Sequence, residues 1–90
     1  MTNNQIASVL NETKVGRVLR LQCTSPGGVK RGYEARIRTR ELDASDQAIA
    51  IFFDDHRSSF ISFGTIRAGD TPNWYLSPAS DLVTAVEILS

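Results

Sequence analysis

The sequence predicts a small all-β protein with one short N-terminal helix, and two adjacent segments support this most strongly. From residue 33 to 39, apolar or small residues alternate with charged ones, which is the period-two pattern of a half-buried strand. After a polar turn, the run 48–53 is apolar at every position, with Ile49, Ile51 and Phe53 on one face. This run predicts a central strand that is covered on both sides.

Length and composition indicate one domain over residues 1–90, with 41% hydrophobic and 22% charged residues. A chain of this size buries only about 60–65% of its unfolded surface, so its core is small and association would add stability. No signal-peptide pattern and no apolar run of about 18 residues is present, so we expect a cytoplasmic protein with no membrane partner. The single cysteine, Cys23, has no partner for an internal disulfide, and we expect it to be a small buried side chain.

The charges are balanced overall but unevenly distributed. The first 45 residues hold eight Lys and Arg against four acidic residues, and the last 45 hold two against six. This asymmetry favours either a basic face for an anionic partner or two complementary faces that meet between copies of the chain. Scattered, solvated charge is the alternative interpretation.

The first half of the chain reads as a helix followed by a hairpin. Thr2 and Gln5 have the spacing of a capping box, and the apolar residues after them share one helical face, which predicts a helix over residues 3–12. The segment 17–23 alternates apolar and polar residues and predicts a second half-buried strand. The Ser-Pro-Gly-Gly sequence at 25–28 then predicts a turn into the strand that contains Tyr33.

The second half contains three more β-prone segments. Residues 60–66 and 74–76 are rich in aromatic and β-branched side chains and are separated by turn-forming residues. Residues 82–89 alternate and are rich in β-branched side chains, which favours a strand. A helix capped at Ser80 is the competing prediction.

Over residues 3–89 the chain resembles the Sm, LSm and Hfq superfamily. The matching positions are Leu19, Leu21, Gly27, Gly28, Tyr33, Ala35, Ile37, Asp43 and Gln47. The segments 74–78 and 81–89 are similar to the last two strands of LSm proteins. Ala35 and Gln47 stand where the family usually has glycine and asparagine, and the Arg-Gly dipeptide between the last two strands is missing.

The resemblance implies a five-stranded, strongly bent antiparallel barrel of the Sm or SH3 type, in which residues 54–73 form a long arm between the third and fourth strands. Other small SH3-type or OB-type barrels are the rivals. The resemblance also implies a homo-oligomeric ring in which residues 74–77 of one copy pair with residues 83–89 of the next. The expected subunit interface consists of Trp74, Tyr75, Leu76, Val83, Ala85, Val86 and Ile88.

The function that the resemblance implies is binding of single-stranded RNA by this ring. Asp43 and Gln47 would contact bases, and Arg36, Arg38 and Arg40 would supply positive charge. The alternative is a structural or protein-interaction ring that has the fold without the RNA site.

No pattern of residues points to catalysis. The only histidine, His56, lies in an Asp-Asp-His-Arg turn without further ligands at metal-binding spacing, and Asp54 and Asp55 are adjacent rather than spaced as an acid and base pair. We therefore expect a protein that is not an enzyme and that has no metal and no cofactor.

Overall fold

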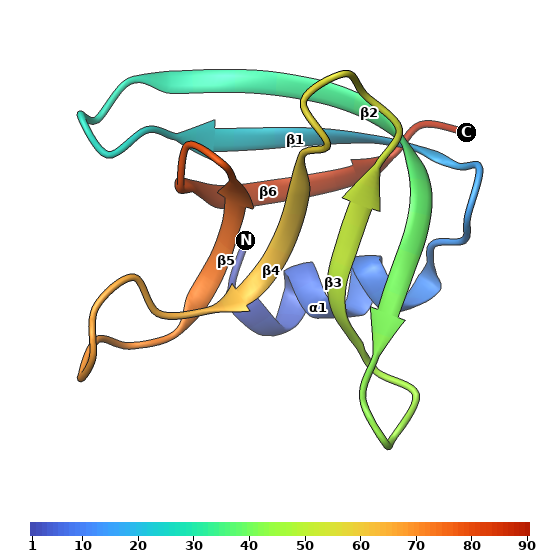
Figure 1. The fold of residues 1–90 in the computed structure, drawn as a ribbon, viewed down its shortest axis with the longest axis horizontal. Helices are drawn as coiled ribbons and strands as arrows, with labels where there is room; N and C mark the ends of the chain where they lie inside the picture. Colours follow the sequence, from blue (N-terminus) through green and yellow to red (C-terminus); the bar gives the residue numbers. More distant parts are fainter.

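The computed structural model describes all residues from Met1 to Ser90 and consists of one helix and six strands. The elements are α1 (Asn3–Glu12), β1 (Val18–Thr24), β2 (Lys30–Leu42), β3 (Ala48–Phe53), β4 (Phe60–Gly64), β5 (Asn73–Ser77) and β6 (Asp81–Ile88). Each strand pairs antiparallel with the next along the chain, and β6 returns to pair with β1, which closes a barrel (Figure 1). The predicted class, an all-β barrel with an N-terminal helix, is confirmed.

The prediction of five strands is wrong, because the barrel has six. The additional strand, β4, lies within residues 54–73, which were expected to form an arm. It pairs with β3 on one side and with β5 on the other, and its Ile61 is fully buried opposite Ile51 and Leu76. The β-prone character of this segment predicted a strand, but the five-strand pattern of the resembled family left no position for it.

The long strand β2 changes direction in the middle, as the sharp bend in Figure 1 shows. Its register against β3 shifts between Ile37 and Thr39, so one extra residue is accommodated there. Ile37 faces the core before this bulge, whereas Arg40 lies opposite the buried Ile51 after it. The bulge therefore reverses the side on which even-numbered residues of β2 lie.

The strand β3 is covered less completely than the sequence predicts. Ile51 and Phe53 are buried, but Ile49 is 42% exposed. Ile49 therefore does not share the buried face of Ile51, and the pairing of β3 with β2 has a second register shift here, between Glu41 and Leu42. The C-terminal segment, in contrast, is the strand that its alternation predicts and not a helix.

The helix α1 closes one end of the barrel and agrees with the predicted residues 3–12. Thr2 and Gln5 form the predicted capping box, and Ile6 and Leu10 are buried against the strands. The Trp74 indole N–H donates to the Asn3 carbonyl oxygen at 3.2 Å. These contacts fix the start of the helix to β5.

The N-terminal residues also fill a gap between β5 and β6. These two strands pair only at Tyr75 with Leu82 and at Leu76 with Asp81. Beyond this corner the Asn3 amide donates to Pro72 and Asn73, and the Met1 nitrogen donates to the Thr84 carbonyl. The N-terminal segment therefore covers part of the edges that the expected ring would use.

Four of the seven expected interface residues belong to the core of this single chain, namely Trp74, Leu76, Val83 and Val86. The core cluster also contains Cys23, which is 2% exposed as predicted. Pairing of β5 and β6 between copies stays a prediction, and it would require the N-terminal segment to share or leave this gap. No helix is long and apolar enough to cross a membrane.

Candidate nucleic-acid interface

The turn between β2 and β3 uses the side chains of Asp43 and Gln47 for its own structure. Asp43 Oδ1 accepts hydrogen bonds from the backbone N–H groups of Ser45 at 2.8 Å and Gln47 at 3.0 Å. Gln47 Oε1 accepts a hydrogen bond from the Asn11 side chain at 2.8 Å. The two predicted base-binding residues are thus brought together, but their polar atoms already support the turn and attach it to α1.

The three arginines predicted to supply charge are divided by the bulge in β2. Arg36 and Arg38 are exposed on the outer face, on either side of the inward-facing Ile37. Arg40 is only partly exposed, lies opposite Ile51, and has a buried Nε without a hydrogen-bond partner. Only Arg36 and Arg38 therefore share a solvent-facing surface.

A pair of phenylalanines lies next to Arg38 on the outside of the sheet. Phe52 of β3 and Phe60 of β4 are directly opposite each other, with ring centroids 5.1 Å apart and ring planes 25° apart. Both are partly exposed, and the Arg38 guanidinium carbon lies 6.0 Å from the centre of the Phe52 ring. An arginine beside stacked aromatic rings is an arrangement that suits a nucleotide base and its phosphate. The sequence did not single out these phenylalanines, because both were assigned to the interior or to the arm.

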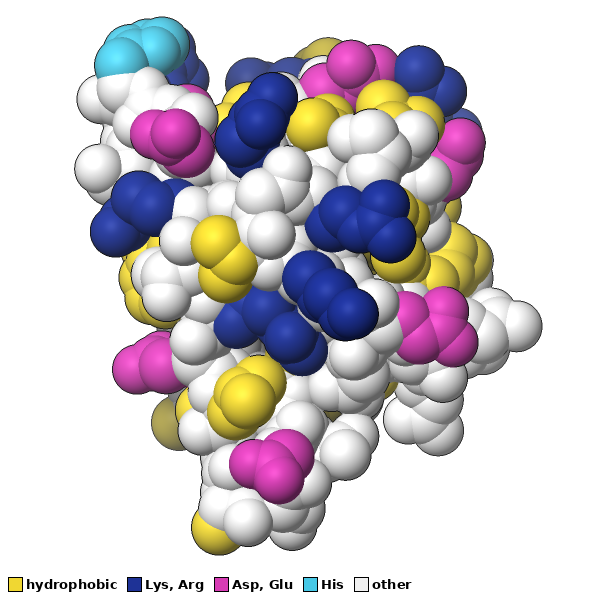
Figure 2. Space-filling view, turned by 90° about the vertical axis from the view of Figure 1, so that its right-hand side faces the viewer, with side chains coloured by type: hydrophobic (Ala, Val, Ile, Leu, Met, Phe, Trp, Pro, Cys, Tyr) yellow, Lys and Arg dark blue, Asp and Glu magenta, His cyan; other side chains and the backbone are white.

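The basic character of this surface is not neutralised within the chain. The only ion pair in the structure joins Arg20 and Glu34, 2.9 Å apart, on the paired strands β1 and β2. Figure 2 shows the side of the barrel where β2 curves, and lysine and arginine side chains gather near its centre with carboxylates around them. Arg36 and Arg38 are thus free to contact an anion.

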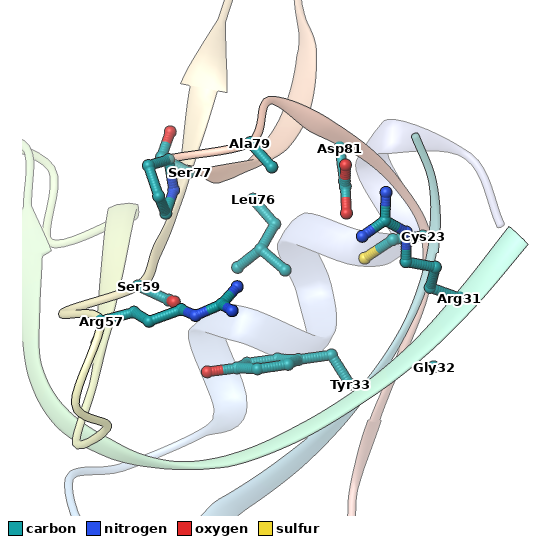
Figure 3. A pocket seen from close by; sticks show the side chains of 11 residues that line it. Cys23, Arg31, Gly32, Tyr33, Arg57, Ser59, Leu76, Ser77, Ala79 and Asp81 are labelled. Atoms are coloured by element: carbon teal, nitrogen blue, oxygen red, sulfur yellow. The ribbon is translucent and has the colours of Figure 1, made fainter. Parts of the chain in front are cut away.

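A pocket opens at the end of the barrel opposite α1 (Figure 3). Its volume is about 110 Å³, and it lies between the β1–β2 hairpin, the β3–β4 loop and the β5–β6 turn. Its polar lining includes Arg31, Tyr33, Arg57, Ser59 and Asp81. None of these residues was singled out as a binding residue from the sequence, because they come from three separate segments.

The β3–β4 loop at this pocket is held by one carboxylate. The Tyr33 hydroxyl donates to Asp55 Oδ2, and Asp55 Oδ1 accepts from the backbone N–H groups of Arg57 and Ser59. Burial raises the pKa of Asp55, but the hydrogen bonds from Ser59 and Arg57 together with the charge of His56 outweigh it and lower the pKa below its usual value. Asp55 therefore fixes the position of the loop that carries Arg57.

Cys23, which is buried, also lines this pocket. Burial raises the pKa of its thiol to about 11, with the negative charge of Asp81 adding to the effect and the positive charge of Arg31 opposing it. A thiol with this pKa is protonated at neutral pH and is a poor nucleophile.

No cluster of three or more His, Cys, Asp or Glu side chains is arranged to hold a metal ion. Comparison of the chain with protein-family models, curated proteins and solved structures finds no match.

Proposed function

We propose that this protein binds single-stranded RNA on the outer face of its barrel, around Arg36, Arg38, Phe52 and Phe60. The observation that carries the proposal is the stacked Phe52–Phe60 pair with Arg38 beside it on a surface whose arginines have no acidic partner. Single-stranded nucleic acids are held by bases that stack on aromatic rings and by basic side chains that contact phosphates.

The charge of the chain and the two rings of this surface favour a short single-stranded segment over a duplex. The net charge of the chain is zero, so the long-range attraction that duplex binding usually requires is weak. Two adjacent rings on neighbouring strands provide stacking for one or two unstacked bases, which a duplex does not present.

The decisive experiment changes a stacking ring and a basic side chain in turn. Phe60→Leu removes a stacking ring, and we expect RNA affinity to fall by about 1–3 kcal/mol. Arg38→Ala should weaken binding of uridine-rich and adenine-rich strands equally and reduce the slope of affinity against salt by about one. Fluorescence anisotropy with a labelled RNA at about 50 and 200 mM salt measures both effects.

Two control variants test whether the RNA contacts belong to this surface. Arg67→Ala removes an exposed arginine from the β4–β5 loop and should leave RNA affinity unchanged. Gln47→Ala should also leave RNA affinity unchanged if the outer face binds the bases. If this variant instead loses its preference between bases, the bases bind at the β2–β3 turn. Absence of RNA binding by the folded wild type at low salt would contradict the proposal.

A protein-interaction role has its own support on another face. Ile49 and Phe63 are 42% and 46% exposed, and both line a shallow hollow with Ala7 of α1. If RNA does not bind, this apolar surface becomes the first candidate for a protein contact. Phe63→Ser would then disrupt that contact, while the RNA-binding variants would not.

A further inference from the structure

The pocket at the open end of the barrel is lined by two arginines that form no ion pair within the chain. The side chains of Arg31 and Arg57 enter it from different segments, as Figure 3 shows. Neither guanidinium has a carboxylate within 4.0 Å. Guanidinium groups are fixed forks of N–H donors that suit the oxygens of phosphate and carboxylate.

The same pocket holds a carboxylate whose hydrogen-bonding capacity is unused. Asp81, at the start of β6, is only 5% exposed, and its Oδ1 is buried with no hydrogen-bond partner. A buried acceptor without a donor is unfavourable, and native structures rarely keep one without a reason. Asp81 lines the pocket, so a small rotation of its carboxylate would bring this oxygen to a ligand with a donor group.

The supporting loop keeps part of this arrangement in place before any ligand arrives. Asp55 anchors the backbone of Arg57 and Ser59 and receives the Tyr33 hydroxyl. Ser59 is itself buried and lines the pocket. The loop therefore needs little reordering on binding, which favours affinity for a small ligand.

We propose that the open end of the barrel is a binding site for a protonated phosphate group, whose oxygens Arg31 and Arg57 contact and whose O–H donates to Asp81. Orthophosphate keeps at least one proton at neutral pH, so it can accept from two arginines and donate to a carboxylate at the same time. Sulfate has the same shape but no proton at this pH, so its oxygen would face Asp81 unfavourably.

The size of the pocket agrees with this ligand. A volume of about 110 Å³ is well below the roughly 300–1,000 Å³ of pockets for drug-sized molecules. It accommodates one phosphate group, and anything attached to that group would extend out through the opening. The phosphate has two possible sources, the free ion or the terminal phosphate of a nucleotide strand.

Isothermal titration calorimetry with sodium phosphate and sodium sulfate, at equal ionic strength, tests the proposal. We expect saturable phosphate binding and at least about tenfold weaker sulfate binding. Arg57→Ala should weaken phosphate binding by about tenfold or more, while the matched control Arg67→Ala should not change it. The far-ultraviolet circular dichroism of each variant confirms that the barrel is folded.

The most specific variant is Asp81→Asn, which replaces an acceptor by a side chain that also donates. This variant should bind sulfate more tightly than the wild type does, a gain that misfolding does not produce. The proposal is overturned if phosphate does not saturate the wild type, if wild-type affinities for phosphate and sulfate are equal, or if Asp81→Asn leaves sulfate binding unchanged.

Titration with uridine 5′-monophosphate distinguishes the two sources of the phosphate group, the free ion and the terminal phosphate of a nucleotide strand. A phosphate monoester is about half protonated near pH 6 and mostly unprotonated near pH 8. Binding of the nucleotide near pH 6 that weakens near pH 8 would assign the site to a terminal phosphate, and binding of orthophosphate alone would assign it to the free ion. The site does not depend on the outer-face RNA proposal, because RNA with a 5′-hydroxyl tests that surface separately.

Discussion

The Asn11 side chain provides the sharpest test of how α1 is joined to the barrel. Asn11 Nδ2 donates to Gln47 Oε1 at 2.8 Å, and Asn11 Oδ1 accepts the backbone N–H of Ala48 at 2.6 Å. Asn11→Ala removes both bonds and leaves the partly buried Ala48 N–H without an acceptor. The lost bonds amount to about 1 kcal/mol each, and the orphaned N–H brings the expected loss to about 2–3 kcal/mol.

For a domain of this size, that loss corresponds to a decrease in Tm of roughly 10–20 °C. Urea unfolding followed by the fluorescence of the buried Trp74 measures the free energy directly. Asn4→Ala is a matched control, because Asn4 is exposed on the same helix. It should be neutral or slightly stabilising, since alanine has the higher helix propensity. If Asn11→Ala costs no more than Asn4→Ala, the proposed link between the helix and the β2–β3 turn is wrong.

Three further measurements test a buried thiol, a loop carboxylate and the state of assembly. Cys23 should resist alkylation in the folded protein at about pH 8, because its pKa is about 11, and should react at once in urea, as mass spectrometry would show. The pKa of Asp55 is lower in the folded protein than its unfolded value of 3.8, so ionised Asp55 stabilises the fold at pH values above 3.8. This contribution disappears as the pH falls through the lower pKa of the folded state. Unfolding of Asp55→Asn should therefore depend less on pH than that of the wild type between about pH 5 and 3. Light scattering will decide the ring prediction, since a mass near the 9.9 kDa of one chain would contradict it.

The sequence was most informative where local patterns decide the structure. The capping box at Thr2 and Gln5, the alternation in β1 and the β-branched content of β6 all depend on neighbours along the chain, and each predicted its element correctly. The bulge between Ile37 and Thr39 could not be predicted in this way. The uninterrupted alternation of β2 placed Arg40 beside Arg36 and Arg38, whereas the pairing with β3 turns it to the other face.

The candidate sites were predicted less well, because they depend on long-range contacts. The sequence predicted that Gln47 contacts a base. In the structure, its side chain instead accepts a hydrogen bond from Asn11, which lies 36 positions away. The pocket residues Arg31, Arg57 and Asp81 come together only because the barrel closes between β6 and β1. No spacing rule in the sequence relates three residues from separate segments of the chain.

The two proposed sites differ in how strongly their unpaired charges indicate function. An exposed arginine without an acidic partner is ordinary, since surface ion pairs contribute at most about 1 kcal/mol. Arg36 and Arg38 therefore need the Phe52–Phe60 pair beside them to indicate binding. Asp81 is different, because a buried acceptor without a partner lowers the stability of the empty protein.

This difference gives a last prediction, in which stability and function change in opposite directions. In phosphate-free buffer, Asp81→Asn should stabilise the barrel by about 1 kcal/mol, because the buried side chain loses its negative charge. Added phosphate should stabilise the wild type further, in proportion to the logarithm of its concentration, and should stabilise the variant less. Urea unfolding at several phosphate concentrations measures both effects. If Asp81→Asn instead destabilises the empty barrel, then Asp81 serves the fold through its attraction to Arg31, and its burial no longer indicates a ligand at this pocket.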